Sequence, residues 1–224
     1  MITGCDYGIG FEFAQQYAND GWIVHATCLK IESREKLALL GKNVNFHHLD
    51  VSNLTAVKSF AAGLQGIAID LFINNAATFA PDGDGQLMLP DMDEFMRVMR
   101  VNAVAPVYIA EALVDQVAIS ERKLMVFIST RSGSIGDNST GGHYAYRCSK
   151  AALNMAVKSM SIEFGKFGII ALVLHPGMVV TETRTGGKGI PVGESVSGMR
   201  SVIESLTPSM AGSFQRYDNG TIEW

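Results

Sequence analysis

Tyr146 and Lys150 lie four residues apart at the start of a segment with helical apolar spacing, YRCSKAALN. Residues i and i+4 share one face of a helix, so the phenol and the ammonium can point at the same ligand. A phenol with a pKa of about 10 is a poor acid at neutral pH, and a nearby ammonium lowers that pKa by stabilising the phenolate. The pair indicates proton exchange with a substrate oxygen, although two exposed polar residues would show the same spacing.

A glycine-rich turn, TGCDYGIG at residues 3–10, leads directly into a second segment with helical spacing. Gly4 lets the chain turn off a strand, Gly8 lets the backbone approach a pyrophosphate, and Gly10 lets the helix pack closely. The unpaired N–H groups at the start of the helix attract phosphate. The turn predicts a dinucleotide site, and hydride transfer to a carbonyl needs both a nicotinamide and a proton donor such as Tyr146.

The end of the second expected strand, Cys28–Leu29–Lys30, bears on which dinucleotide binds. An acidic residue there binds the adenosine ribose of NAD, and a basic residue suits the 2′-phosphate of NADP. No Asp or Glu lies at this tip; Lys30 is the nearest charge, and Glu32 follows two residues later. Lys30 at the end of this strand therefore favours NADP, although NAD is not excluded. In the alternative interpretation, Lys30 is a solvated loop residue that does not contact the cofactor.

Apolar runs and amphipathic stretches alternate along the chain, and these elements must position both motifs. We expect strands at residues 22–28, 44–49, 69–74, 124–129 and 169–174. Helical apolar spacing predicts helices at residues 11–19, 34–40, 54–64, 92–114 and 144–164. Strands that are apolar on both faces and alternate with helices indicate a parallel sheet covered on both sides. The prediction is a three-layer, doubly wound α/β fold of the Rossmann type, with residues 1–224 forming a single domain.

Two segments disturb this regularity. Thr183–Gly198 is rich in Gly, Ser and Thr, which predicts a flexible loop that covers the substrate at about residues 183–200. Only Met1 and Ile2 precede Thr3, so the first strand is expected to be truncated. The first strand of such a sheet is central, and its truncation should cost stability. Either the natural chain begins further upstream or the domain tolerates a stub.

Composition excludes several classes of protein. Of the 224 residues 47% are hydrophobic, enough for a sizeable core, which excludes a disordered chain. A net charge of −4 argues against nucleic-acid binding, and no apolar run reaches the roughly 18 residues of a membrane span. Cys5, Cys28 and Cys148 lack zinc-like spacing and are expected to be reduced thiols in a cytoplasmic protein. His47 and His48 should point to opposite strand faces, so we expect no metal site.

With these motifs in order, the chain resembles the short-chain dehydrogenase/reductase family along nearly its whole length. The resemblance implies that the glycine turn, including Tyr7 and Ile9, binds the cofactor. Asp50–Val51 is similar to a pair that meets the adenine, and Asn74–Ala77, with Ala76, resembles the family's Asn-Asn-Ala-Gly run. The resemblance further implies that Lys150 holds a cofactor ribose. The run beside the nicotinamide is matched by Pro176, Gly177, Val179 and Thr181.

The same resemblance implies a catalytic set of Asn102, Thr130, Tyr146 and Lys150. Asn102 matches the helix Asn that holds a water in the proton relay, and Thr130 stands where the family usually has the second Ser of a pair. Thr130 keeps the hydroxyl and adds a methyl group that narrows the pocket. Other departures are Ala77 in place of a glycine, and Tyr7 and Leu29 at positions that are often basic in NADP-dependent members.

More narrowly, the segment before Tyr146 and the tail GSFQRYDNGTIEW resemble the subgroup of Sniffer-type carbonyl reductases and the bacterial contact-signalling factor. The resemblance implies an NAD(P)-dependent oxidoreductase acting on a small carbonyl or alcohol substrate, with NADP as the expected cofactor. A homodimer or homotetramer built on residues 92–114 and 144–164 is also implied. The alternative is a dinucleotide-binding signalling or regulatory protein of the same fold with little or no reductase activity.

Overall fold

A computed structural model describes residues 1–80, 89–182 and 188–224. Its main sheet has seven strands in the order β3-β2-β1-β4-β5-β6-β9, and every neighbouring pair is parallel. The strands of this sheet are β1 (Ile2–Thr3), β2 (Val24–Cys28), β3 (Val44–His48), β4 (Leu71–Asn74), β5 (Leu124–Ile128), β6 (Ile170–His175) and β9 (Phe214–Arg216). Two short strands, β7 (Val179–Val180) and β8 (Ile190–Pro191), pair separately.

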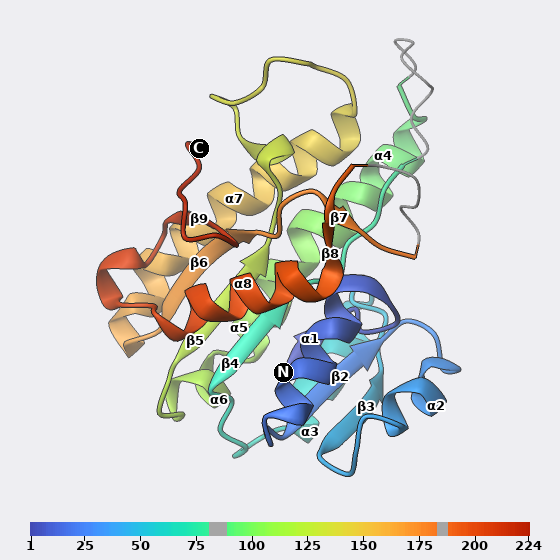
Figure 1. Ribbon diagram of the computed structural model, residues 1–224, viewed down its shortest axis with the longest axis vertical. Helices are drawn as coiled ribbons and strands as arrows, with labels where there is room; N and C mark the ends of the chain where they lie inside the picture. The colour runs from blue at the N-terminus through green and yellow to red at the C-terminus, as the bar shows by residue number, and fades with distance from the viewer. Residues whose placement is uncertain (81–88, 183–187) are drawn as a thin grey trace.

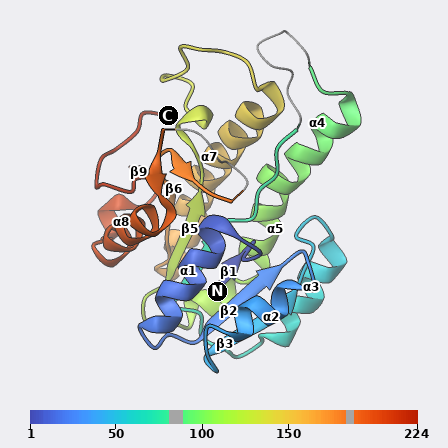
Figure 2. The ribbon, with the colours of Figure 1, turned by 45° about the vertical axis from the view of Figure 1, so that its right-hand side comes forward.

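Helices cover both faces of the sheet (Figures 1 and 2). The α-helices are α1 (Gly8–Asn19), α2 (Ser33–Ala38), α3 (Leu54–Gly63), α4 (Met92–Met99), α5 (Ala105–Ala112), α6 (Val114–Ala118), α7 (Tyr144–Phe164) and α8 (Val192–Glu204). A π-helix, η1 (Arg100–Val104), joins α4 to α5, and three 3₁₀ turns complete the set: η2 (Arg131–Gly133), η3 (Gly165–Phe167) and η4 (Pro208–Met210).

Alternation along the strands divides the core into two layers. Phe72 and Met125 pack with residues of α3, α5, α6 and α7 on one face, whereas Ile73 and Val126 pack with α1, α2 and α8 on the other. Strand side chains alternate between the two faces, so a strand covered on both sides must be apolar throughout. The predicted three-layer, doubly wound fold is confirmed.

The central strand β1 is as short as expected. Ile2 nevertheless pairs with Ala26 of β2 and with Ile73 of β4. The strand order reverses between β1 and β4, and in open α/β sheets a ligand binds at the carboxyl edge beside this reversal.

The helix predicted at residues 92–114 is interrupted by the wider π turn of η1. Pro106 follows in the first turn of α5 and has no backbone N–H to donate. A π-bulge accommodates one extra residue in a helix and often lies at a functional site. In Figure 2 the segment runs from α4 into α5 as one bent column.

The prediction of a flexible loop at about residues 183–200 is wrong for the second half of that range. There, Ile190–Pro191 forms β8 and Val192–Glu204 forms α8. Ser195 and Val196 are fully buried, and the Ser195 hydroxyl donates to the Pro176 carbonyl at 2.6 Å. Small residues there allow close packing, so tertiary contacts override weak helix propensity. Residues 183–187 lie outside the described residues.

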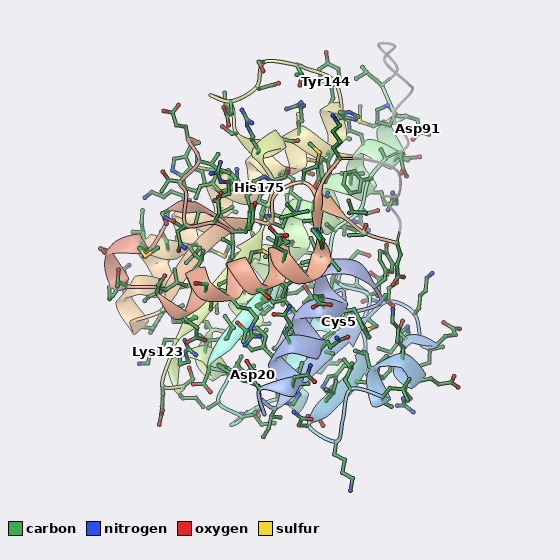
Figure 3. The ribbon with its side chains drawn as sticks, viewed as in Figure 1. Cys5, Asp20, Asp91, Lys123, Tyr144 and His175 are labelled. Atoms are coloured by element: carbon green, nitrogen blue, oxygen red, sulfur yellow. The ribbon has the colours of Figure 1, made fainter. Side chains whose placement is uncertain are left out.

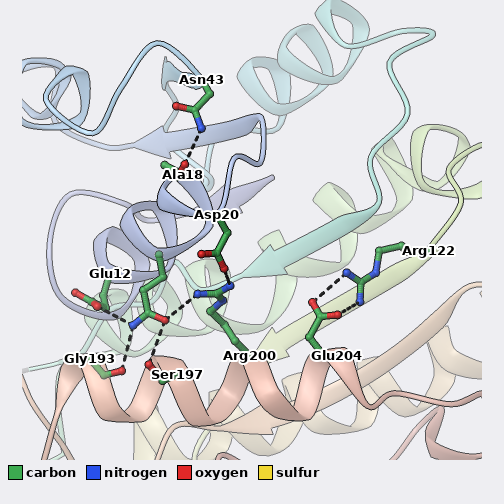
Figure 4. A network of polar contacts seen from close by, with 10 residues as sticks. Glu12, Ala18, Asp20, Asn43, Arg122, Gly193, Ser197, Arg200 and Glu204 are labelled. Atoms are coloured by element: carbon green, nitrogen blue, oxygen red, sulfur yellow. Dashed lines mark hydrogen bonds and ion pairs between the residues drawn. The ribbon is translucent and has the colours of Figure 1, made fainter.

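Polar contacts join α8 to α1 and to the start of β5 (Figure 4). Arg200 pairs with Asp20 and donates to Gln16 Oε1 at 3.1 Å, while Arg122 binds both carboxylate oxygens of Glu204 at 3.0 and 2.8 Å. These ion pairs are partly exposed, so each contributes at most about 1 kcal/mol, and we interpret them as fixing the direction of α8.

The carboxyl-terminal tail returns to the loop that follows β5. The ring of Trp224 stacks on Phe214 with centroids 5.5 Å apart, and the Trp224 carbonyl accepts a hydrogen bond from Gly136 N–H at 3.1 Å. Neither β9 nor this contact was expected from the sequence. Among the described residues, no helix is both long and apolar enough to cross a lipid bilayer.

Candidate active site

The glycine turn lies at the carboxyl end of β1 and has the shape that a pyrophosphate requires. Gly4 and Gly8 adopt φ values of +70° and +59°, which side chains disfavour. A Cβ on Gly4 would lie 2.8 Å from Ala76 Cα, and one on Gly10 would collide with the Gly4 carbonyl oxygen. These glycines are therefore required by local geometry.

The start of α1 carries an uncompensated positive end. Tyr7, its N-cap residue, gives no side-chain cap, and the first turn contains no acidic residue. The first N–H groups of a helix have no partner within the helix, and its dipole attracts anions. The start of α1, at Gly8, Ile9 and Gly10, can therefore attract an anion such as a phosphate.

Asn75 holds this turn, although the sequence drew attention to Asn74 and Ala76. Its amide Nδ2 donates to the carbonyls of Thr3 and Gly4, both at 3.0 Å. The hydroxyl of Thr3 accepts from the N–H groups of Asn75 and Ala76, also at 3.0 Å. Asn74 is buried at the end of β4. These bonds clamp the end of β1 to the end of β4.

The expected adenosine-binding residues lie at the ends of β2 and β3. Asp50 is exposed, and its Oδ1 accepts from the N–H and hydroxyl of Ser52 at 2.9 and 2.7 Å. Val51 packs partly buried against the core, and Lys30 is exposed. The second carboxylate oxygen of Asp50, Oδ2, takes no part in the bonds to Ser52.

Asp6, inside the glycine turn, also reaches this corner. Its carboxylate accepts from Leu29 N–H and Lys30 N–H, both at 3.0 Å, and from the Ser33 hydroxyl at 2.7 Å. Two donors from the loop after β2 and one from the first residue of α2 thus converge on one carboxylate. No feature of local spacing signalled this contact, because the partners lie 23 to 27 residues away.

Lys150 and Tyr146 lie in the first two turns of α7, at the end of β5. Lys150 is 3% exposed and its Nζ donates to the Ile128 carbonyl at 2.9 Å. Burial lowers the pKa of Lys150 to about 8. Its Nζ lies 6.0 Å from the centre of the half-buried Tyr146 ring. The ammonium therefore lies near the Tyr146 ring, on the same side of α7.

Thr130 follows β5 and caps η2. Its Oγ1 accepts from Ser132 N–H at 3.2 Å, and that bond does not use the hydroxyl hydrogen. Ser129 points into the core and donates to Asn154 Oδ1 at 2.8 Å. Of the two neighbouring hydroxyls, that of the half-buried Thr130 is therefore the more accessible one.

Asn102 lies within the π turn η1 and is fully buried. Its Oδ1 accepts from Thr78 N–H and its Nδ2 donates to the Thr78 carbonyl, both at 2.8 Å. A further bond runs from Nδ2 to Ser149 Oγ at 3.0 Å, on the same helix as Lys150. The side chain thus ties the loop after β4 to α7.

That loop also carries Phe79, whose ring stacks on Tyr146 with centroids 4.0 Å apart. Arg97 of α4 donates to Thr78 Oγ1 at 2.7 Å and to the Phe79 carbonyl at 2.9 Å. Phe79 is 61% exposed, so its remaining surface forms an aromatic wall beside the phenol. Figure 3 shows Tyr144, the first residue of α7, and Asp91, the residue before α4, at the same end of the molecule.

The run after β6 faces the glycine turn. Gly177 has a φ of +82°, and a Cβ there would lie 2.8 Å from the ring of Tyr217. Val179 is buried in β7, and Thr181 follows this strand. A Cβ on Gly8 would lie 3.4 Å from Thr181 Cγ2. Together with Pro176, whose carbonyl is bound by Ser195, these residues form the wall opposite the turn.

A family model described as short chain dehydrogenase matches residues 1–187. The chain belongs to this family. One relative is the 1-hydroxy-2-glutathionyl-2-methyl-3-butene dehydrogenase of Rhodococcus sp. (strain AD45), 32% identical and aligned over 100% of this chain and 98% of its own. Another is the C-signal protein of Myxococcus xanthus, 33% identical over 75% of this chain and 100% of its own.

Two solved structures support the same family. The carbonyl reductase Sniffer of D. melanogaster is 27% identical with a TM-score of 0.90, and the match covers 100% of this chain and 98% of that chain. The NADPH-bound carbonyl reductase from chicken fatty liver is 28% identical with a TM-score of 0.89, covering 100% and 93%. The likeness to Sniffer-type carbonyl reductases predicted from the sequence is confirmed.

Cys148 of this short-chain dehydrogenase lies on α7 and is exposed. His47 Nε2 lies 3.0 Å from Nδ1 of His25 on the neighbouring strand β2, and not against His48. The described residues contain no group of three or more His, Cys, Asp or Glu side chains placed to hold a metal ion.

Proposed function

We propose that this protein is an NAD(P)-dependent oxidoreductase that reduces a carbonyl to an alcohol, or performs the reverse. The observation that carries the proposal is the Tyr146–Lys150 pair beside Thr130, at the same sheet edge as the uncapped start of α1. A bound nicotinamide supplies or accepts the hydride at C4. The protein's residues bind, orient and move the proton.

In the direction of reduction, the Tyr146 hydroxyl gives its proton to the substrate oxygen as the carbonyl carbon gains the hydride. Lys150 stabilises the resulting phenolate and binds the cofactor ribose. The hydroxyl of Thr130 donates to the substrate oxygen and orients it. Asn102 supports the return of a proton to Tyr146 through water. The overall change consumes one carbonyl, one reduced cofactor and one proton.

The proposed cofactor is NADP, with NAD also accepted. The chicken carbonyl reductase, with its bound NADPH, supports the proposal, as does the exposed Lys30 at the end of β2. Gly4, Asp50, Val51, Asn74 and Ala76 would line the adenosine and pyrophosphate half. The nicotinamide half would lie against Pro176, Gly177, Val179 and Thr181.

A small carbonyl or alcohol is the proposed substrate, and the stacked ring of Phe79 favours one with an apolar or aromatic group next to the reacting carbon. We also propose a homodimer or homotetramer and a cytoplasmic location. Exposed apolar side chains on α4, α5 and α7 support self-association, and the three free thiols support a reducing compartment.

A second candidate is a signalling or regulatory protein that binds the dinucleotide and turns over slowly. Its support is the 33% identity with C-signal and the replacement of the usual serine by Thr130. An assay of the purified protein distinguishes the two candidate functions. It measures oxidation of NADPH and NADH in the presence of aldehydes, ketones and quinones. Oxidation of the cofactor with at least one carbonyl supports the reductase. Tight cofactor binding without turnover across the panel supports the second candidate.

A further inference from the structure

The carboxylate of Asp6 occupies the corner where a dinucleotide-binding fold distinguishes NAD from NADP. In such folds the end of the second strand faces the 2′ position of the adenosine ribose. Here that end comprises Leu29 and Lys30, and the backbone N–H groups of both residues point at Asp6 rather than into solvent. Asp6 is therefore an acidic group at the ribose-binding corner that comes from the glycine turn instead of from the strand.

The donors that Asp6 engages are those that an anion at this corner would use. Two backbone N–H groups and the Ser33 hydroxyl all donate to it. A 2′-phosphate would have to compete for these donors and approach a group of the same charge. A ribose 2′-hydroxyl meets neither obstacle, because it can donate a hydrogen bond to the carboxylate.

The neighbouring charges offset Asp6 only in part. Lys36 is engaged with Glu182 at 3.4 Å and with the ring of Phe11, and Arg34 lies over the ring of Phe46. Lys30 and the acidic Glu32 and Glu35 complete the charged groups of this loop and of α2. Tyr7 and Leu29 add no charge. The corner therefore lacks the cationic cluster that would favour a phosphate strongly.

We propose that Asp6 is a specificity-determining residue that reduces the preference for NADPH over NADH, so that the protein binds both cofactors with similar affinity. The inference rests on the proposed function and deepens it. The Asp6 carboxylate accepts the ribose 2′-hydroxyl of NADH and repels the 2′-phosphate of NADPH.

The test measures dissociation constants for NADPH and NADH by cofactor fluorescence, with Asp6→Asn as the main variant. The asparagine oxygen still accepts from a backbone N–H, while its NH₂ group donates to a phosphate. We expect the ratio of the NADH constant to the NADPH constant to rise at least tenfold. Asp6→Ser, which keeps a short hydrogen-bonding group, is a second variant in case the first fails to fold. Glu121→Gln removes the same charge far from this corner and should leave the ratio unchanged.

Ionic strength gives an independent measurement on the unmodified protein. Salt screens charge repulsion over about 10 Å at 0.1 M. Asp6→Asn should bind NADPH more tightly than the unmodified protein does, and this difference in affinity should decrease as the salt concentration rises. An unmodified protein that prefers NADPH by more than a hundredfold, or a ratio that changes less than twofold in both variants, overturns the inference alone. Failure of the unmodified protein to bind either cofactor overturns the proposed function.

Discussion

The ring of Tyr146 lies 6.0 Å from Lys150 Nζ and stacks on the ring of Phe79. Tyr146→Phe removes only the oxygen and keeps the stacked ring, so cofactor binding should remain within about threefold. Loss of a general acid lowers turnover by roughly 10²–10⁴-fold. Steady-state kinetics with a responsive carbonyl, together with a fluorescence titration of the cofactor, checks both expectations. Turnover equal to that of the unmodified protein would remove Tyr146 from the mechanism.

Lys150 makes a pH-dependent contribution to stability whose sign follows from burial. Its pKa falls to about 8 in the folded chain, against about 10.4 in an unfolded chain, so folding disfavours the charged form. The cost is fully present below pH 8 and disappears as the pH rises to about 10.5. This lowering of the Lys150 pKa corresponds to roughly 3 kcal/mol of folding free energy.

Comparison with the Lys150→Gln variant separates the pH-dependent contribution of Lys150 to stability from the contributions of the other titrating groups. Between pH 7 and pH 10.5 the free energy of unfolding of the unmodified protein should rise by about 3 kcal/mol relative to the variant. Urea unfolding at several pH values in the absence of cofactor measures it. A difference independent of pH would mean that Lys150 keeps its ordinary pKa in the fold.

At the scale of the elements, the close approach of α1 to the glycine turn is the most demanding contact. Gly10→Ala would drive a methyl group into the Gly4 carbonyl and the Asn75 amide. Overpacking of this kind costs about 1–3 kcal/mol, and displacement of α1 should raise the cofactor dissociation constant at least tenfold. Chemical denaturation and fluorescence titration measure the two effects.

Gly63→Ala is the matched control, because a Cβ there meets nothing within 4 Å at the end of α3. That substitution should stabilise the protein by about 0.5–1 kcal/mol and leave cofactor binding unchanged. If both substitutions had the same effect, close packing at Gly10 would not be the reason for its glycine.

The sequence was sufficient to predict the elements whose apolar periodicity is strong. The runs that became β4, β5 and β6 are apolar on both faces, and α7 was placed at its exact bounds, Tyr144–Phe164. It was not sufficient for α8 and β9. The composition of α8 resembles a loop, and β9 has only three residues, Phe214–Arg216. Both are stabilised by tertiary contacts: α8 packs on one face of the sheet, and β9 pairs with β6.

The residues of the candidate site also divide into those that could be predicted from the sequence and those that could not. Residues in contiguous motifs, such as Gly8 and Lys150, could be predicted because spacing alone expresses their chemistry. The contacts of Asp6, Asn75 and Phe79 could not be predicted, since their partners are far away in sequence and are brought together only where parallel strands end at one edge. Arg97 of α4 likewise binds the loop that carries Phe79, 18 residues earlier in the chain.

At the scale of the whole molecule, α7 presents two exposed apolar side chains seven residues apart. Met155 is 68% exposed and Ile162 is 66% exposed, while Met96 on α4 is 56% exposed. Contiguous exposed apolar surface can mark a site of association. We expect the protein to elute as a dimer or tetramer at micromolar concentration, and the double variant Met155→Lys, Ile162→Lys to elute as a monomer.

Light scattering on a size-exclusion column gives the mass, and circular dichroism confirms that the double variant remains folded. Ile119→Lys is a suitable control, because Ile119 is 61% exposed after α6, outside these helices, and should not change the mass. A monomeric unmodified protein at tens of micromolar would contradict the proposed assembly.

The docking of Trp224 gives the molecule an optical signal close to its chemistry. The chain has two tryptophans, and Trp22→Phe would leave the indole of Trp224 as the single source of long-wavelength emission. That indole stacks on Phe214 while its own carbonyl binds Gly136, six residues after Thr130. Any shift of the loop on ligand binding should therefore alter the emission maximum, so stopped-flow fluorescence can time loop movement separately from hydride transfer.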